Sequence, residues 1–230
     1  MNPLLNRLIP HLLLNFHFAP NEGLLNGKMG GVIFFGYYAQ YTGKTYFREY
    51  AEELLDDIFD RVHENIPINF IDGLCGIGWG IEYLIQHSLM DGDADEVLED
   101  IDKKIIERDP MYINDLSLYT GLQGILMYIN ARLSHFRTNN YQPFPDEYLQ
   151  RVNKHITSIL ASTNVETSAE FNNIANYFTS RTNNKTAPDY SLEITNEFYG
   201  TLPSNFQNLH SSPIGIYQGL TGFAFKSILS

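Results

Sequence analysis

Cysteine is almost absent from this 230-residue sequence, which contains Cys75 and no other. A disulfide within the chain is therefore impossible, and a zinc site built mainly from cysteine ligands is excluded. Long apolar runs are lacking as well, since no stretch approaches the roughly 20 residues that a membrane-spanning helix needs. The apolar segment 1–16 is interrupted by Arg7, Pro10 and His11, unlike the core of a secretory signal. We therefore expect a cytoplasmic protein that does not insert into a membrane.

Positive charge is scarce too, because 15 Lys and Arg stand against 27 Asp and Glu and the formal net charge is −12. Nucleic acids and anionic membranes attract basic surfaces, so this balance argues against both as partners. It suits a cationic or neutral partner. Hydrophobic residues make up 43% of the chain, which is enough for one domain, 1–230, with a sizeable core.

Glycine, by contrast, recurs in a regular pattern. Pairs of glycines three residues apart begin at Gly27, Gly73, Gly121 and Gly219, and each pair precedes an apolar run. The steps between these pairs are 46, 48 and 98 residues, so one copy without the glycines is expected near 168–180. A period of this length indicates one helical hairpin per repeat.

The segments between the glycine pairs have a different character. In 46–64 the apolar residues recur at three- and four-residue spacing, as in an amphipathic outer helix. Segments 93–108 and 146–161 are interpreted as further outer helices, and the apolar segment 3–18 as the first. The glycine-started runs are apolar nearly all round, as buried inner helices are. Segment 163–201 is rich in Asn, Thr and Ser, and we expect a surface excursion or a ligand-facing loop there.

No segment shows sustained alternation of apolar and polar residues, so an all-α protein without a substantial sheet is predicted. A glycine inside a helix costs up to about 1 kcal/mol relative to alanine, and its repetition needs a structural reason. In a closed ring the inner helices converge and their backbones approach closely, whereas in an open solenoid they fan apart. We therefore predict an α/α toroid, a small or partial barrel of about five hairpins with glycine-rich inner helices.

A nucleotide-binding loop is the competing interpretation of these glycines. Gly43-Lys44-Thr45 has the ending of a phosphate-binding loop, but Tyr38 stands where that motif needs its first glycine. A helix also precedes this segment, where the motif requires a strand. Gly43 is better interpreted as the C-terminal cap of the first inner helix.

The glycine motif, especially DGLCGIGWGIEYL from Asp72 and YTGLQGILMYI from Tyr119, resembles the lanthionine synthetase C-like (LanC-like) family. The resemblance implies an α/α toroid and a role in the biosynthesis of modified, lanthipeptide-type peptides. Cyclases of the family hold zinc at the ring mouth through two cysteines and a histidine, and the metal activates a peptide thiol. Here Cys75 precedes Gly76 and not a histidine, so the resemblance implies a zinc-free protein without a cofactor. We expect it to bind a peptide or a peptide-modifying enzyme at the ring mouth.

The ligand-binding residues predicted to line the central cavity are Cys75, Trp79, Glu82, Gln86, Gln123 and Asn130. The first four lie at steps of four, three and four, on one face of the second inner helix. The other two hold equivalent positions in the next inner helix. A mixed polar and aromatic lining suits a peptide or a small polar ligand. The alternative is that these groups only satisfy one another in the core.

An active enzyme on the same scaffold is a second hypothesis. Asp72 and Asp115 each precede an inner helix, and paired carboxylates at a ring mouth are typical of glycoside hydrolases. Asp72 is also a natural helix N-cap. Cys75 becomes a nucleophile if the helix N-terminus stabilises its thiolate, although no histidine base is near in sequence. Further hypotheses are a zinc-dependent thioether cyclase with unexpected ligands, a structural helical-repeat adaptor, and a homodimer that covers an open side of the ring.

Overall fold

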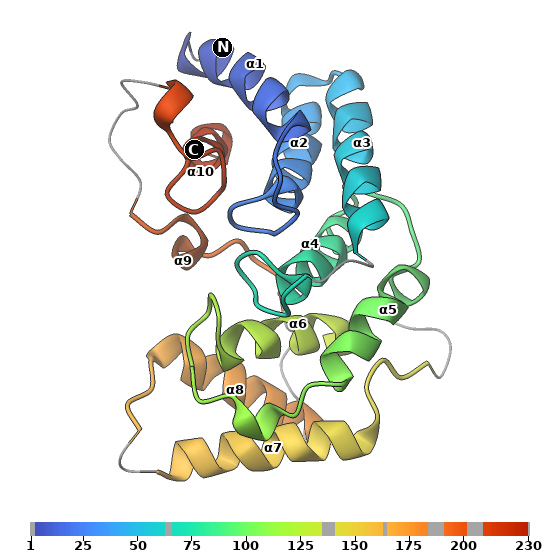
Figure 1. Cartoon of the computed structure of the whole chain (residues 1–230), viewed down its shortest axis with the longest axis vertical. Helices are drawn as coiled ribbons and strands as arrows, with labels where there is room; N and C mark the ends of the chain where they lie inside the picture. Colours follow the sequence, from blue (N-terminus) through green and yellow to red (C-terminus); the bar gives the residue numbers. More distant parts are fainter. Residues whose placement is uncertain are drawn as a thin grey trace.

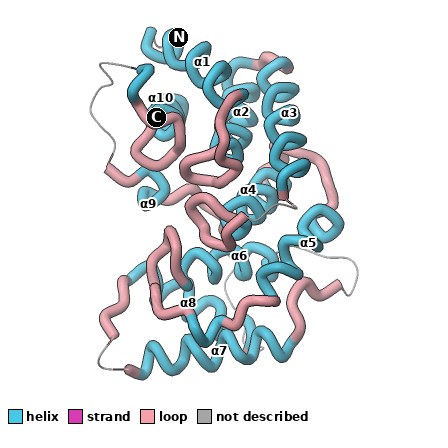
Figure 2. Tube along the Cα trace, viewed as in Figure 1, coloured by secondary structure: helices cyan, strands magenta, loops and turns pink. Residues whose placement is uncertain are grey.

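The protein, in a computed structural model, is described for residues 3–62, 66–134, 141–162, 165–183, 191–201 and 209–229. Within these ranges it is all-helical, as predicted, and no strand occurs (Figures 1 and 2). The α-helices are α1 (Pro3–His17), α2 (Lys28–Thr42), α3 (Tyr46–Arg61), α4 (Leu74–Gln86), α5 (Ala94–Ile106), α6 (Leu122–Ser134), α7 (Asp146–Ala161), α8 (Ala169–Thr182), α9 (Asn196–Tyr199) and α10 (Leu220–Leu229). Two 3-10 turns are η1 (Pro110–Tyr112) and η2 (Leu209–Ser211). None of the helices in these ranges combines the length and apolar character needed to cross a bilayer.

The predicted alternation of two helix kinds is confirmed. Helices α2, α4 and α6 bury nearly all of their first turns and most later side chains. Helices α3, α5 and α7 bury one face and leave the other to solvent. The segment expected to hold the copy without glycines, 168–180, forms α8. Packing joins α10 to α2, α2 to α4, α4 to α6, and α6 to α8.

The ends of these helices test the predicted caps. Gly43 ends α2 in the left-handed region, with φ of 67°, and its N–H donates to the Ala39 carbonyl at 2.8 Å, as a C-cap does. Asp93, the first residue of the outer helix predicted at 93–108, is the N-cap of α5, and its side chain accepts from the Asp95 N–H at 2.9 Å. The N-cap predicted at Asp72 is wrong, because Gly73 holds the cap position of α4 and no side chain caps this helix.

The paired glycines lie where the loop before each inner helix folds back onto the helix start. In all four copies, a Cβ on the second glycine would lie 2.0 to 2.4 Å from the carbonyl oxygen six residues earlier. The N–H after each first glycine donates to the carbonyl seven residues earlier, at 2.8 or 2.9 Å. These glycines therefore make room for their own loops. Close approach between inner helices falls instead on Gly78 and Gly80, which face Tyr128 of α6 and Met29 of α2.

Backbone hydrogen bonds join the four glycine loops. The N–H of Tyr217 donates to the Leu25 carbonyl at 3.0 Å, and that of Leu25 donates to Ile71 at 2.9 Å. The N–H of Ile71 donates in turn to Tyr119 at 3.0 Å. These four residues share one position in the repeat, two before the first glycine, so the sequence period is also a period of contacts.

Helix α9 connects the third glycine loop to the last. The Tyr119 hydroxyl donates to the Glu197 carbonyl at 3.1 Å. At the other end of α9, the Gln218 N–H donates to the Tyr199 carbonyl at 2.9 Å. The series of hydrogen bonds that runs through the loops thus returns, by way of α9, to the loop from which it began.

Candidate functional site

The predicted cavity face of α4 is mostly buried in the core. Cys75, Trp79 and Glu82 are fully buried, and Gln86 is exposed at the end of the helix. Burial raises the pKa of the Cys75 thiol, which disfavours the thiolate. A neutral thiol with no access to solvent argues against the nucleophile hypothesis.

Glu82 belongs to an ionic cluster around Arg132 of α6. The Arg132 guanidinium lies 2.7 Å from the Glu82 carboxylate, 3.0 Å from that of Asp95 and 2.7 Å from that of Asp102. The Tyr128 hydroxyl also donates to Asp102, at 2.5 Å. Burial raises the pKa of Asp102, and the nearby guanidinium opposes this shift. Glu82 therefore ties α4 to α5 and α6, which is a structural role.

The two aspartates considered as catalytic groups lie in separate loops. The Asp115 carboxylate accepts from Thr120 Oγ1 at 2.5 Å and from the Ser117 N–H at 2.8 Å. The hydrogen bond from Thr120 is the main reason that the pKa of Asp115 is lowered. Asp72 packs its backbone against Gly23, and its Oδ1 is buried without a partner among the described residues. Neither aspartate belongs to the wall of the pocket that follows.

The two predicted ligand-binding amides on α6, Asn130 and Gln123, form hydrogen bonds to two residues of this pocket. Asn130 is fully buried, and its Nδ2 donates to the Ile174 carbonyl of α8 at 3.2 Å. Gln123 is also buried, and its Nε2 donates to the Glu197 carboxylate at 3.1 Å. Both amides thus support elements that form the pocket, although they are not themselves in its wall.

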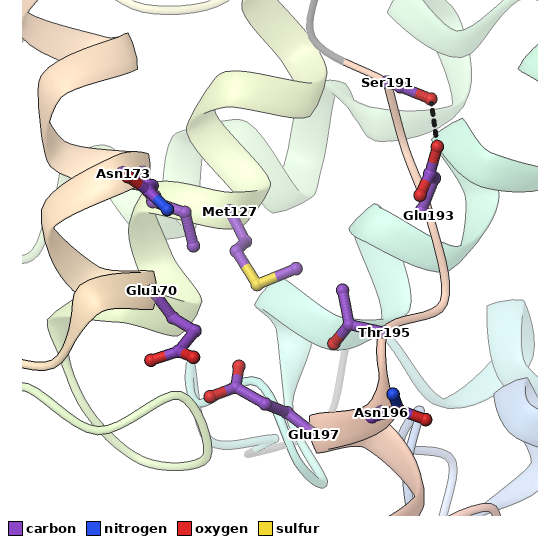
Figure 3. Close-up of a pocket in the computed structure, with 9 residues that line it drawn as sticks. Met127, Glu170, Asn173, Ser191, Glu193, Thr195, Asn196 and Glu197 are labelled. Carbon is purple, nitrogen blue, oxygen red and sulfur yellow. Dashed lines mark hydrogen bonds between the residues drawn. The ribbon is translucent and has the colours of Figure 1, made fainter.

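A pocket of about 360 Å³ opens between α6, α8 and the segment 191–197 (Figure 3). Its wall consists of Met127, Glu170, Asn173, Ile174, Ser191, Glu193, Thr195, Asn196 and Glu197. Met127 and Ile174 supply an apolar part, and the remaining side chains are polar or acidic. A pocket that combines an apolar surface with a few polar groups is typical of ligand sites.

Negative charge gathers at this pocket. Glu170, in the first turn of α8, and Glu197, in α9, extend toward one another in Figure 3. Glu193 lies on the same side as α9 and accepts from the Ser191 hydroxyl at 3.2 Å. Burial is the largest cause that raises the pKa of Glu197, the charge of Glu170 adds to it, and the Gln123 hydrogen bond opposes it. Since no residue of the described wall is basic, the pocket favours a cation.

None of these wall residues is among the ligand-binding residues predicted above, although Met127 shares one face of α6 with Gln123 and Asn130. All but Met127 fall in 163–201, the segment with the weakest periodicity. Part of that segment, expected to be either a surface excursion or a ligand-facing loop, lines the pocket. Glu170, Glu193 and Glu197 share this stretch with other charged residues, such as Glu166 and Asp189, so no local pattern sets them apart.

Zinc does not fit the described residues. No group of three or more His, Cys, Asp or Glu in the described ranges is placed to hold a metal ion. Comparison with known proteins does not supply an identity either, because no family model, curated protein or solved structure matches this chain.

Proposed function

We propose that this chain is a zinc-free, cytoplasmic LanC-like protein of modified-peptide biosynthesis. It binds a peptide, or a partner enzyme, at the mouth of a small α/α toroid. The resemblance of the glycine motifs supports the family and the peptide pathway. The toroid is supported by the packing of α10 onto α2, and by the hydrogen bonds that join the glycine loops through α9.

We infer the binding site from the carboxylates of Glu170 and Glu197, which extend toward one another in the pocket. Glu170 lies in the first turn of α8 and Glu197 in α9, and the main-chain carbonyl of Glu197 accepts from Tyr119 of the third glycine loop. A lysine or arginine side chain, or an N-terminal amine, would donate charge-assisted hydrogen bonds to both carboxylates. Met127 and Ile174 would cover the alkyl stem of such a group. The net charge of −12 adds a longer-range attraction for a basic peptide.

Binding of lysine-containing peptides by calorimetry tests this proposal. Each peptide is compared with its lysine-acetylated form, which keeps the stem and removes the charge. We expect acetylation, or the double change Glu170→Gln and Glu197→Gln, to weaken binding by about tenfold or more, because a hydrogen bond to a charged group contributes about 1.5–3 kcal/mol. Glu99→Gln, on the exposed face of α5, is the matched control. Equal affinity for both peptide forms would contradict a cationic ligand.

Metal content gives an independent test of the zinc-free assignment. We expect less than stoichiometric zinc in the purified protein by elemental mass spectrometry, and no change on Cys75→Ser, because the Cys75 thiol is buried and its protonated form is favoured. If the protein contains about one zinc per chain and loses it on Cys75→Ser, the zinc-free assignment is wrong and the thioether cyclase hypothesis is favoured.

A carboxylate-based hydrolase is the second candidate, and the raised pKa of Glu197 favours it. Burial and the charge of Glu170 raise the pKa of Glu197, and the general acid of a glycosidase is a carboxyl group whose pKa is raised by its surroundings. In this candidate Glu197 would protonate the glycosidic oxygen, and Glu170 would act as nucleophile or base. Hydrolysis of aryl glycosides by the wild type that is lost in Glu197→Gln would establish this candidate. If a panel of aryl glycosides is not hydrolysed, the hydrolase is excluded and the binding proposal remains.

A further inference from the structure

Helix α9 inserts an aromatic side chain into the middle of the fold. The ring centroid of Phe198 lies 5.1 Å from that of Trp79 and 5.5 Å from that of Phe70, and Phe198 is fully buried. Trp79 stacks in turn on Tyr83, with 5.1 Å between ring centroids. The indole that was predicted to line a cavity is therefore covered by a residue more than a hundred positions later in the chain.

The covered indole has an unmet hydrogen-bonding group. Trp79 is fully buried, and its Nε1–H has no acceptor among the described residues. Buried indole N–H groups usually find a partner, and an unpaired buried donor is unfavourable. Phe198 fills the space but offers its neighbour no acceptor. The Trp79 indole is thus enclosed by an aromatic ring while its N–H group is left without an acceptor in the described part of the chain.

The contacts of α9 resemble those of a bound linear peptide. Its main-chain carbonyls at Glu197 and Tyr199 accept from the Tyr119 hydroxyl and the Gln218 N–H. The Glu197 carboxylate accepts from Gln123. An aromatic anchor between two main-chain hydrogen bonds, with one specific polar contact beside it, is a common form of peptide recognition. All three donors come from outside α9, namely from α6 and from two glycine loops.

We propose that α9 occupies a peptide-binding site of this scaffold in cis, and that a linear peptide with a carboxylate followed by an aromatic residue binds there in trans when α9 is displaced. This inference rests on the proposed role in peptide binding and specifies a second ligand chemistry. The incoming aromatic ring takes the place of Phe198 against Trp79 and Phe70. The incoming carboxylate takes the place of Glu197 at Gln123, so the acidic character of the adjoining pocket is retained.

Trp79 reports on this site directly, because the chain has one tryptophan. In the full-length Phe198→Ala variant we expect a red-shifted emission and acrylamide quenching several-fold stronger than in the wild type. A synthetic peptide with the sequence of residues 195–200, TNEFYG, is expected to restore the wild-type emission in a saturable manner. The same peptide with alanine in place of phenylalanine is expected to have no effect. Phe16→Ala, in α1, is the control for loss of a buried ring elsewhere.

Two results would overturn the inference. One is an unchanged Trp79 emission on addition of TNEFYG to Phe198→Ala, and the other is equal restoration by the alanine peptide. If Phe198→Ala does not fold by circular dichroism, Phe198→Leu replaces it, since leucine keeps apolar volume but no ring. The wild type is expected to bind TNEFYG at least tenfold more weakly than either variant, because its own α9 competes. Acetylated-lysine peptides test the adjoining pocket separately, so failure of the one proposal is distinguishable from failure of the other.

Discussion

Single residues in this protein take their roles from burial more than from type. Glu82 and Glu197 are both glutamates that face amide or guanidinium donors, but their surroundings differ. Glu82 is enclosed with Arg132 in the core, whereas Glu197 lies at a pocket with Glu170 opposite. The first holds helices together, and the second remains available to a ligand or a proton.

The raised pKa of Glu197 leads to a pH dependence of stability. The folded state binds this proton more tightly than the unfolded chain, so the contribution is present below the unfolded pKa of about 4.3 and is lost as the pH rises through the folded value. We expect Glu197→Gln to gain stability relative to the wild type as the pH is raised from about 4 to 7. Urea unfolding midpoints measured across that range test this, with Glu99→Gln as the control. A difference that is independent of pH would contradict the burial of the charge.

At the scale of elements, the glycine loops are the most constrained feature. Gly76 has no room for a side chain, since a Cβ would lie 2.0 Å from the Phe70 carbonyl oxygen. Gly36, in the middle of α2, meets its nearest atom, Leu89 Cβ, at 3.7 Å, which is an ordinary contact. Gly76, which belongs to a glycine pair, and Gly36, which does not, therefore differ in their tolerance of a side chain.

Alanine substitutions separate these two cases. We expect Gly76→Ala to lower the free energy of unfolding by about 2 kcal/mol or more, because the loop must move off the start of α4. Gly36→Ala is expected to be neutral or to stabilise by up to about 1 kcal/mol through helix propensity. Urea denaturation of both variants measures the contrast. If Gly76→Ala lowers the free energy of unfolding by much less than this, the loop packs less tightly against the start of α4 than the structure shows.

At the scale of the whole molecule, the loops before the inner helices are linked end to end. The hairpins are therefore not joined only to their neighbours in sequence. The Tyr217 N–H in the loop before α10 donates to the Leu25 carbonyl in the loop before α2, although most of the sequence separates the two loops. The predicted homodimer, which would cover an open side of the ring, stays a prediction. The linked loops predict that the first and last repeats unfold together.

Native-state hydrogen exchange tests that cooperativity. The N–H groups of Leu25, Ile71 and Tyr217 are expected to share one high protection, close to that of global unfolding. The Ser117 N–H, which donates to the exposed side of Asp115, is expected to exchange much faster. Rapid exchange at Tyr217 alone would mean that the last repeat opens independently and would weaken the toroid proposal.

The helices were predictable from the sequence because their signals are local. Segment 146–161 forms a helix with the predicted bounds, and the predicted outer helix at 46–64 ends only slightly earlier. The glycine period identified the repeated loops, although it misassigned the close contact of the paired glycines, which is made to the loops and not to neighbouring helices. A periodicity of three to four residues and a fixed glycine spacing are properties of the sequence itself, so they can be recognised without knowledge of the tertiary structure.

The site was decided by the tertiary structure. Gln123 and Glu197 are 74 residues apart, and Arg132 and Glu82 are 50 apart, so no local pattern associates them. Trp79, on the face of α4 that was predicted to meet a ligand, is covered by Phe198, which comes from the least periodic segment of the chain. The sequence determined which helices form and where their loops repeat. Only the long-range packing of α6, α8 and α9 decided which carboxylates face a pocket and which are enclosed with a cation, because burial and charge pairing depend on neighbours that are distant in the chain.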